Sequence, residues 1–254
     1  MLLIILIAIF GLILGSFLNV VIHRLPEKQS LSTPGSHCPV CGQAVRWFDN
    51  VPLLSYLLLG GRCRDCKTRI PMRYPLVELL TGLGFALLYW RYGWTYTFGR
   101  YLLLFLFLVP IAFIDWDRKL ILNRLTLPCA VVGALYILVF QTAMWTDMLI
   151  GGAAGALVLL AIGVLGNLIF KKESLGMGDV KLIGIIGIYA GFPQVLYVLI
   201  FAMITATVYI LVGLIGKRLE MGRTIPFGPF IAIGALMQFI VGDQILMWYV
   251  GLYQ

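Results

Sequence analysis

The stretch MLLIILIAIFGLILGSFLNVVI, residues 1–22, contains no charged side chain. A helix that crosses a lipid bilayer needs about 20 mostly apolar residues in succession. A cleaved signal peptide would instead have a Lys or Arg ahead of an apolar run of about 7–15 residues. We therefore predict that residues 1–22 form a retained first transmembrane helix.

The rest of the chain has the same apolar character. Of its 254 residues, 61% are hydrophobic and 12% are charged, and the mean hydropathy is +0.98. Because soluble domains carry about 25% charged residues, this composition indicates an all-α polytopic membrane protein with about eight transmembrane helices. The expected spans are residues 2–22, 75–91, 96–114, 125–141, 147–170, 180–192, 194–216 and 227–250.

This division predicts three parts, which are the first helix (1–22), a cytoplasmic module (23–74) and a seven-helix membrane domain (75–254). The basic residues indicate their orientation. Of the 19 lysines and arginines, all but Arg91 and Arg100 fall in alternate loops, beginning with the first. Loops rich in Lys and Arg stay in the cytoplasm, so both termini are expected on the outer side. The net charge of +8 then follows from topology and does not call for a nucleic-acid partner.

Two Cys-x-x-Cys pairs lie in the long first loop, with Cys38 and Cys41 in CPVC and Cys63 and Cys66 in CRDC. Two such pairs are typical of a tetrahedral zinc site with four thiolate ligands. Two disulfides are the alternative, but the cytoplasm keeps thiols reduced. Four cysteine ligands leave no position for a reactive water, so we expect one structural zinc ion per chain.

Three basic residues, one histidine and the fifth cysteine bear on this prediction. Arg62, Arg64 and Lys67 surround the second pair and are expected to favour thiolates. His37 directly precedes the first pair and is an alternative ligand. Cys129, the fifth cysteine, falls inside an apolar span, and we expect it to pack in the interior.

Aspartates are expected to meet at one face of the membrane. The third span runs inward and ends in AFIDWDRK, which contains Asp115 and Asp117, and the sixth runs outward from GMGDVK, which contains Asp179. The opposite directions of these spans bring both acidic motifs to the cytoplasmic boundary. Asp117 lies roughly 200° around a helix from Asp115, so Asp115 and Asp179 are the candidate catalytic pair.

Such a pair suits hydrolysis. Two neighbouring carboxylates do not both ionise easily, so one keeps its proton and an acid stands beside a base, as in aspartic proteases. The glycines that precede Asp179 permit unusual dihedral angles and close backbone contact. The alternative is that acids at the ends of spans are simply hydrated at the interface. Acids at membrane depth that face a protein interior are, however, usually functional.

Together these motifs resemble those of the bacterial type IV prepilin peptidases, which are leader peptidase/N-methyltransferases. The resemblance extends over nearly the whole chain. It is carried by the two cysteine pairs together with GLILGSFLNVVIHRLP (11–26), DNVPLLSYLLLGGRCRDC (49–66), RYPLVE (73–78), IDWDRKLILN (114–123), GMGDVK (176–181) and IPFGPF (225–230). It implies that Asp115 and Asp179 are catalytic. One position departs from the family pattern, since Asn123 stands where the family often has Asp.

The resemblance further implies an intramembrane aspartyl endopeptidase of the bacterial inner membrane. Such an enzyme removes the short basic leader of type IV prepilins, or of type II secretion pseudopilins, at the cytoplasmic face. It then N-methylates the new amino terminus, with S-adenosylmethionine as the methyl donor. No motif for the donor is readable in the sequence, and we expect its site near the cysteine module and the cytoplasmic loops.

Two other classes of function are compatible with parts of the sequence. A transporter or channel could use Asp115 and Asp179 to bind ions or protons, although its carboxylates usually lie near the middle of the membrane. A zinc adaptor without chemistry would need only the cysteine module. Nothing in the sequence indicates an oligomeric state.

Three further polar features have more than one interpretation. Asn19 is expected to hydrogen-bond a neighbouring helix. Glu78 is expected either to pair with Arg73 or to line a polar pocket. IPFGPF, with two prolines and a glycine, either shapes a substrate groove or simply begins a helix.

Overall fold

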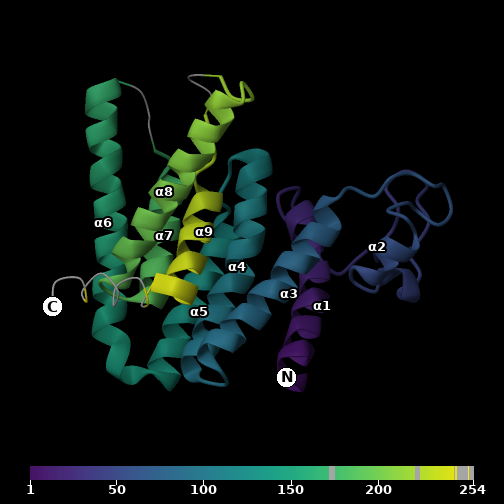
Figure 1. Cartoon of the computed structure of the whole chain (residues 1–254), viewed down its shortest axis with the longest axis horizontal. Coiled ribbons are helices and arrows are strands. Elements are labelled where there is room, and N and C mark those ends of the chain that lie inside the picture. Colours follow the sequence, from purple (N-terminus) through teal and green to yellow (C-terminus); the bar gives the residue numbers. More distant parts are fainter. Residues whose placement is uncertain (172–174, 221–223, 243, 245–250, 252–254) are drawn as a thin grey trace. The chain divides into compact units, whose positions relative to one another are not determined.

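The structure is a computed structural model, and it describes residues 1–171, 175–220, 224–242, 244 and 251. The regular structure in these residues is helical apart from two isolated β-bridges, which confirms the all-α prediction. The chain divides into two compact units, residues 1–93 and 94–254 (Figure 1).

The first unit is a helical hairpin that carries a loop module. Its helices are α1 (Leu2–Arg24), the short α2 (Leu54–Leu58) and α3 (Arg73–Tyr92), and a 3₁₀ turn covers Trp47–Asn50. Helices α1 and α3 pack against each other through small residues. A Cβ atom on Gly11 would lie 2.9 Å from the Cα of Gly82, and one on Gly15 would lie 2.8 Å from the Cα of Glu78. Small residues let membrane helices approach closely in this way.

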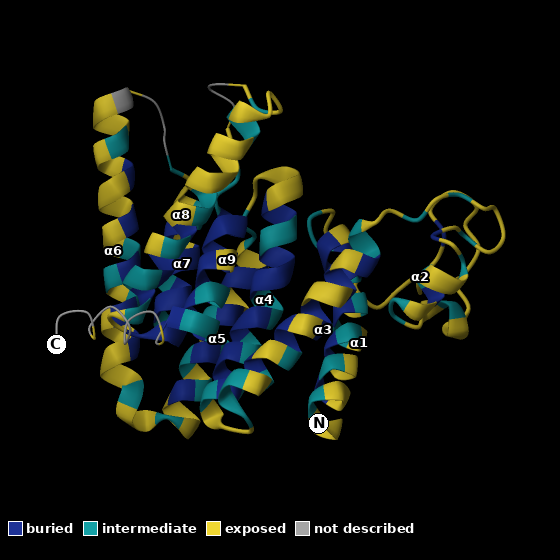
Figure 2. Cartoon of the chain, in the orientation of Figure 1, coloured by how far each residue is buried: buried dark blue, intermediate teal, exposed yellow. Residues whose placement is uncertain are grey.

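The second unit contains the remaining helices. These are α4 (Tyr96–Arg118), α5 (Asn123–Phe140), α6 (Trp145–Phe170), α7 (Met177–Ala190), α8 (Gln194–Ile215) and α9 (Gly228–Met237), and a π-helical turn follows at Gln238–Gly242. Helices α7 and α9 are largely buried, whereas α6 and α8 expose long apolar faces (Figure 2). Exposed apolar faces are expected where helices contact lipid.

Helix α7 is held firmly on two sides. The Tyr189 hydroxyl donates a 2.7 Å hydrogen bond to the carbonyl of Cys129 on α5, and both residues are fully buried. On the other side, Gly151 of α6 and Gly187 of α7 face each other so closely that a Cβ on either would meet the backbone of the other. Cys129 is therefore an interior packing residue, as predicted.

Among the described residues, five helices are long and apolar enough to cross a membrane: α1, α4, α5, α6 and α8. Helices α3, α7 and α9 do not meet both criteria within the described residues, and part of the predicted span 227–250 lies outside them. Helix α4 continues to Arg118, beyond the predicted end at residue 114. Arg100 was assigned to a loop but is buried inside α4. Helix α2 was not predicted.

Candidate active site and metal cluster

Asp115 lies near the end of α4, and its side chain is buried, with 5% of the residue exposed. Its Oδ2 atom accepts a 3.0 Å hydrogen bond from the backbone N–H of Gly228, the first residue of α9. The amino terminus of a helix carries a partial positive charge that favours a nearby carboxylate. A Cβ atom on Gly228 would lie 2.6 Å from Oδ2, so only glycine leaves room for this contact.

Asp179 lies in the first turn of α7 and is half-buried. The two glycines of its motif have separate steric roles. A Cβ on Gly176 would lie 3.2 Å from the carboxylate of Asp179, and one on Gly178 would lie 3.0 Å from the Cβ of Ile121. Gly176 has ordinary extended dihedrals, with φ −76° and ψ 136°. Close approach therefore accounts for these glycines, and the expected unusual dihedral angles are not seen at Gly176.

The structure brings the two acids together. Asp115 and Asp179 are close enough for the charge of one to act on the other. Asp117 is exposed, whereas Asp115 is buried on the same helix, so the two acids of IDWD face different surroundings. The sequence led us to expect that these two acids are neighbours, and helices α4 and α7 do contact each other. The sequence did not anticipate Gly228 as the hydrogen-bond donor to Asp115, although IPFGPF had been singled out.

Residues at the connection between α4 and α5 hydrogen-bond both the segment before α9 and helix α7. Lys119 ends α4 in the left-handed conformation, with φ 53°, and its Nζ donates a 2.6 Å hydrogen bond to Oγ1 of Thr224, shortly before α9. On α7, Nζ of Lys181 donates to Oδ1 of Asn123 at 3.4 Å. The position that departs from the family pattern thus contacts the helix that carries Asp179.

The four cysteines of the loop module form one cluster. The Sγ atoms of Cys38, Cys41, Cys63 and Cys66 all lie within 4.8 Å of one another, and all four thiols are free. The Sγ atoms of Cys38 and Cys66 are 3.7 Å apart. A zinc–sulfur bond is about 2.3 Å long, so two sulfurs of a zinc tetrahedron lie about 3.8 Å apart. The donor set therefore fits a tetrahedral zinc ion.

Both cysteine pairs fold in the same way. The N–H of Gly42 donates to the carbonyl of Cys38 at 2.9 Å, and the N–H of Lys67 donates to that of Cys63 at 3.1 Å. Gly42 and Lys67 each follow the second cysteine of a pair and have positive φ, 72° and 59°. This repeated tight turn directs both thiols of a pair to the same point.

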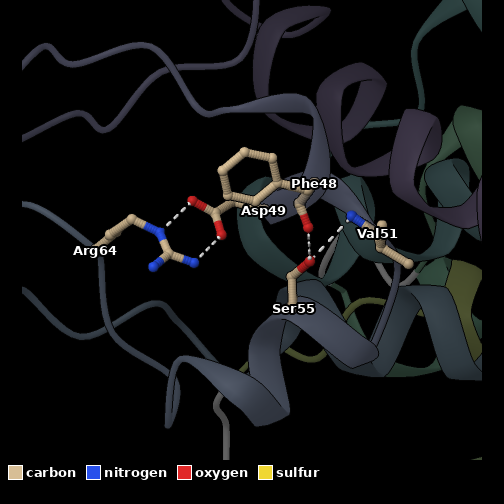
Figure 3. A network of polar contacts seen from close by, with 5 residues as sticks. All are labelled: Phe48, Asp49, Val51, Ser55 and Arg64. Carbon is tan, nitrogen blue, oxygen red and sulfur yellow. Dashed lines mark hydrogen bonds and ion pairs between the residues drawn. The ribbon is translucent and has the colours of Figure 1, made fainter.

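The thiols of the cluster have unequal acidities. The side-chain hydrogen bond between Cys66 and Thr68 lowers the pKa of Cys66 to about 6, whereas the pKa of Cys41 is raised to about 11. Arg64, expected to favour thiolates, instead donates two hydrogen bonds to Asp49, at 2.6 and 2.7 Å (Figure 3). His37 is not part of the cluster, and its Nδ1 lies 2.9 Å from the carbonyl oxygen of Gly35.

Two buried polar residues tie the hairpin of the first unit together. Asn19 on α1 donates a 3.0 Å hydrogen bond to the carbonyl of Tyr74 on α3, which confirms its predicted interhelical role. Glu78 is 8% exposed, and its Oε2 accepts a 2.9 Å hydrogen bond from the N–H of Leu53. It also accepts a hydrogen bond from Ser16 on α1. These contacts link Glu78 to the turn before α2 and to α1.

Comparison with known families is consistent with this geometry. A family model described as the type IV leader peptidase family matches residues 101–211, which include Asp115 and Asp179. A second model, the bacterial peptidase A24 N-terminal domain, matches residues 9–92 and includes the four cysteines.

The chain belongs to the type IV leader peptidase family. It is similar to a prepilin leader peptidase/N-methyltransferase of Myxococcus xanthus, with 42% identity over 87% of this chain and 67% of the relative. The same name is given to relatives in Pseudomonas aeruginosa, with 38% identity over 95% of this chain and 91% of the relative, and in Neisseria gonorrhoeae, with 34% identity over 94% and 90%. No solved structure matches. The matches to these last two relatives cover more than nine tenths of the chain and therefore include both of its units.

Proposed function

We propose that the protein removes the leader of type IV prepilins or pseudopilins and N-methylates the new amino terminus. The observation that carries this proposal is the meeting of Asp115 and Asp179 in the segment matched by the leader peptidase family. The relatives, which are named for both activities, support the methyl transfer. A transporter role for the same aspartates is not favoured, because none of these matches points to transport.

The two acids divide the work of hydrolysis. An ionised carboxylate takes a proton from a water molecule, and the water oxygen attacks the carbonyl carbon of the scissile bond. The protonated partner donates its proton to the carbonyl oxygen, which gives a tetrahedral diol. The C–N bond then breaks as the first carboxyl group passes the proton that it took from water to the leaving amine, and a diol hydroxyl returns a proton to the partner carboxylate. The hydrogen bond from Gly228 fixes the orientation of the Asp115 carboxyl group. This keeps the general acid and base in position before substrate arrives.

The four cysteines hold one zinc ion with a structural role. The support for this role is the closed set of four sulfur donors at a spacing that suits zinc. Bound zinc would link two segments of the loop module, residues 38–41 and 63–66, and hold them in a fixed relative position.

The protein crosses the bacterial inner membrane about eight times, with both termini outside and the aspartates at the cytoplasmic face. The five long apolar helices support a multi-pass arrangement. The alternation of basic loops supports the orientation. A prepilin has its basic leader in the cytoplasm and its apolar helix in the bilayer, so its scissile bond would lie at the level of the aspartate pair.

The experiment that tests the peptidase role uses purified protein and a prepilin peptide. Asp115→Asn and Asp179→Asn are each expected to lower the cleavage rate by about 10²–10⁴-fold, which is the usual contribution of a general acid or base. Asp117→Asn, on the exposed side of the same helix, is the matched control and is expected to keep substantial activity. Full cleavage by either of the first two variants would remove that residue from the mechanism.

A further inference from the structure

The connection between α4 and α5, residues 119–122, contacts both the segment before α9 and helix α7. None of its residues belongs to a helix. Lys119 at its start and Ile121 within it each contact another element, and so does Asn123, the first residue of α5. These are alternate positions, and Leu120 between the first two is 49% exposed. Alternate side chains of an extended segment share one side, so one side of the connection is turned toward the protein.

Lys119 ends α4 in a backbone conformation that is usual for glycine. Its φ is 53° and its ψ is 44°, and its N–H donates a 2.7 Å hydrogen bond to the carbonyl of Asp115. Glycine is common at this helix-ending position because a Cβ atom disfavours the left-handed region. Lys171 ends α6 in the same way, with φ 51° and its N–H bonded to the carbonyl of Asn167. Of these two lysines, only Lys119 has a side-chain hydrogen bond among the described residues, from Nζ to Oγ1 of Thr224 at 2.6 Å. The contact, and not the conformation, sets Lys119 apart.

Two hydrogen bonds join the end of α4 to the segment before α9. Oδ2 of Asp115 accepts from the N–H of Gly228 at 3.0 Å. Lys119 donates to Thr224, and each partner of this second bond lies four residues from a partner of the first. Residues 224–226 belong to no helix, so no regular backbone structure holds them. A single hydrogen bond would leave this segment free to pivot, whereas two bonds fix its direction. That direction decides whether the N–H of Gly228 points at the carboxylate.

The same connection contacts α7 before and after Asp179 in the sequence. A Cβ atom on Gly178 would lie 3.0 Å from the Cβ of Ile121, so Ile121 packs against the backbone directly before Asp179. After Asp179, Nζ of Lys181 donates to Oδ1 of Asn123 at 3.4 Å. This hydrogen bond is long, and the packing of Ile121 is the firmer of the two contacts. One connection thus bears on the elements that place both carboxylates.

We propose that the connection between α4 and α5 positions the acid pair and that Lys119 is its main positioning residue. The proposal rests on the peptidase half of the proposed function. Lys119 does not touch the substrate; its hydrogen bond to Thr224 holds the segment before α9 in place. That segment in turn keeps the N–H of Gly228 on Asp115. The Asp115 carboxyl group is then oriented before the substrate arrives, which is how positioned groups gain rate.

Steady-state cleavage of a prepilin peptide by the purified full-length protein tests this role. Lys119→Met keeps an unbranched side chain but removes the donor, and it should lower kcat by about three- to tenfold, the usual worth of one hydrogen bond. KM should stay within about twofold, because the change affects the reacting groups and not the binding of the peptide. Lys119→Arg keeps a donor and should retain at least about half of kcat. Lys171→Met is the matched control, because it removes the same charge from the same kind of helix end, and its kcat should stay within about twofold.

A double-mutant cycle separates this contact from a general loss of structure. Thr224→Val removes the other partner of the hydrogen bond, so the double variant with Lys119→Met should be no slower than either single variant. Amide hydrogen exchange gives a second readout. In Lys119→Met, exchange within residues 224–230 should be faster, while exchange in α8 stays unchanged.

Four kinetic outcomes would each overturn the proposal: an unchanged kcat in Lys119→Met, additive losses in the double variant, an equal loss in Lys171→Met, or an arginine variant as slow as the methionine variant. If the unsubstituted protein cleaves no prepilin, the proposed peptidase function fails. Amide exchange within residues 224–230 still reports on the lysine contact by itself, and unchanged exchange there in Lys119→Met would overturn the positioning role.

Discussion

At the scale of single residues, the Asp115 carboxylate can approach the backbone of residue 228 because glycine has no side chain there. The N–H of Gly228 donates to Oδ2 of Asp115, and a Cβ atom would lie 2.6 Å from that oxygen and 3.1 Å from Cγ. Both distances are below ordinary van der Waals contact, and the nearest atoms belong to a short side chain that has little freedom to move.

Gly228→Ala should therefore displace the Asp115 carboxyl group and lower the rate of prepilin cleavage by at least about tenfold, or about 1.4 kcal/mol in the barrier. Peptide cleavage by the purified variant measures this. Gly251→Ala is the control, because a Cβ atom there would meet nothing within 4 Å among the residues that the structure describes. An unimpaired Gly228→Ala enzyme would show that the contact does not position the catalytic acid.

Leu53 offers a second prediction about a single residue. Its φ of 57° is unfavourable for any residue with a Cβ atom. Leu53→Gly and Leu53→Ala both remove the side chain, but only glycine relieves the backbone. We expect the Gly variant to be more stable than the Ala variant by about 1 kcal/mol, the reverse of the usual order. Denaturation of both variants measures the difference, and an Ala variant of equal or greater stability would contradict it.

At the scale of elements, the cysteine module contains two turns whose four thiols a metal ion would join. We expect purified protein to contain one zinc ion per chain, and Cys66→Ser or a chelator to remove it and to speed proteolysis within residues 25–72. Leader cleavage should be affected less, because the aspartate pair lies in the other unit. Metal analysis and limited proteolysis report these effects.

The control for this prediction is His37→Ala, since His37 precedes Cys38 but lies outside the sulfur cluster. That variant should retain its zinc. A zinc-free sample of unsubstituted protein that was kept reduced and remained active would argue against the site, as would loss of zinc from His37→Ala.

The sequence predicted most of the helices but not the contacts between distant segments. Apolar runs predicted the helices well, because a bilayer leaves few other ways to satisfy the backbone. The end of α4 differs from the prediction because charged residues suggest a boundary, yet Asp115 and Arg118 remain helical. Contacts between distant segments, such as the N–H of Gly228 at Asp115, leave no local pattern. The positive φ of Leu53 gave no signal either, because glycine is the residue usually expected there.

At the scale of the whole molecule, the distribution of Lys and Arg predicts which turns face outward. A cysteine at Ala143, in the turn between α5 and α6, should react with a membrane-impermeant thiol reagent added to spheroplasts, which expose the outer face of the inner membrane. A cysteine at Arg218, after α8, should react only in inverted vesicles. Both positions are exposed in the structure. The opposite labelling pattern would invert the proposed orientation.

The shortness of α7 has a consequence for the membrane itself. Its 14 residues span about 21 Å, whereas the hydrocarbon core of a bilayer is about 30 Å thick. If α7 spans the bilayer as proposed, this hydrophobic mismatch is met by local thinning of the bilayer or by an aqueous hollow beside Asp179. Either response would bring water to a peptide bond that otherwise lies at the edge of lipid. Prepilin cleavage in vesicles of graded acyl-chain length should therefore be fastest in thin bilayers, and a rate independent of thickness would show that the protein supplies the water path on its own.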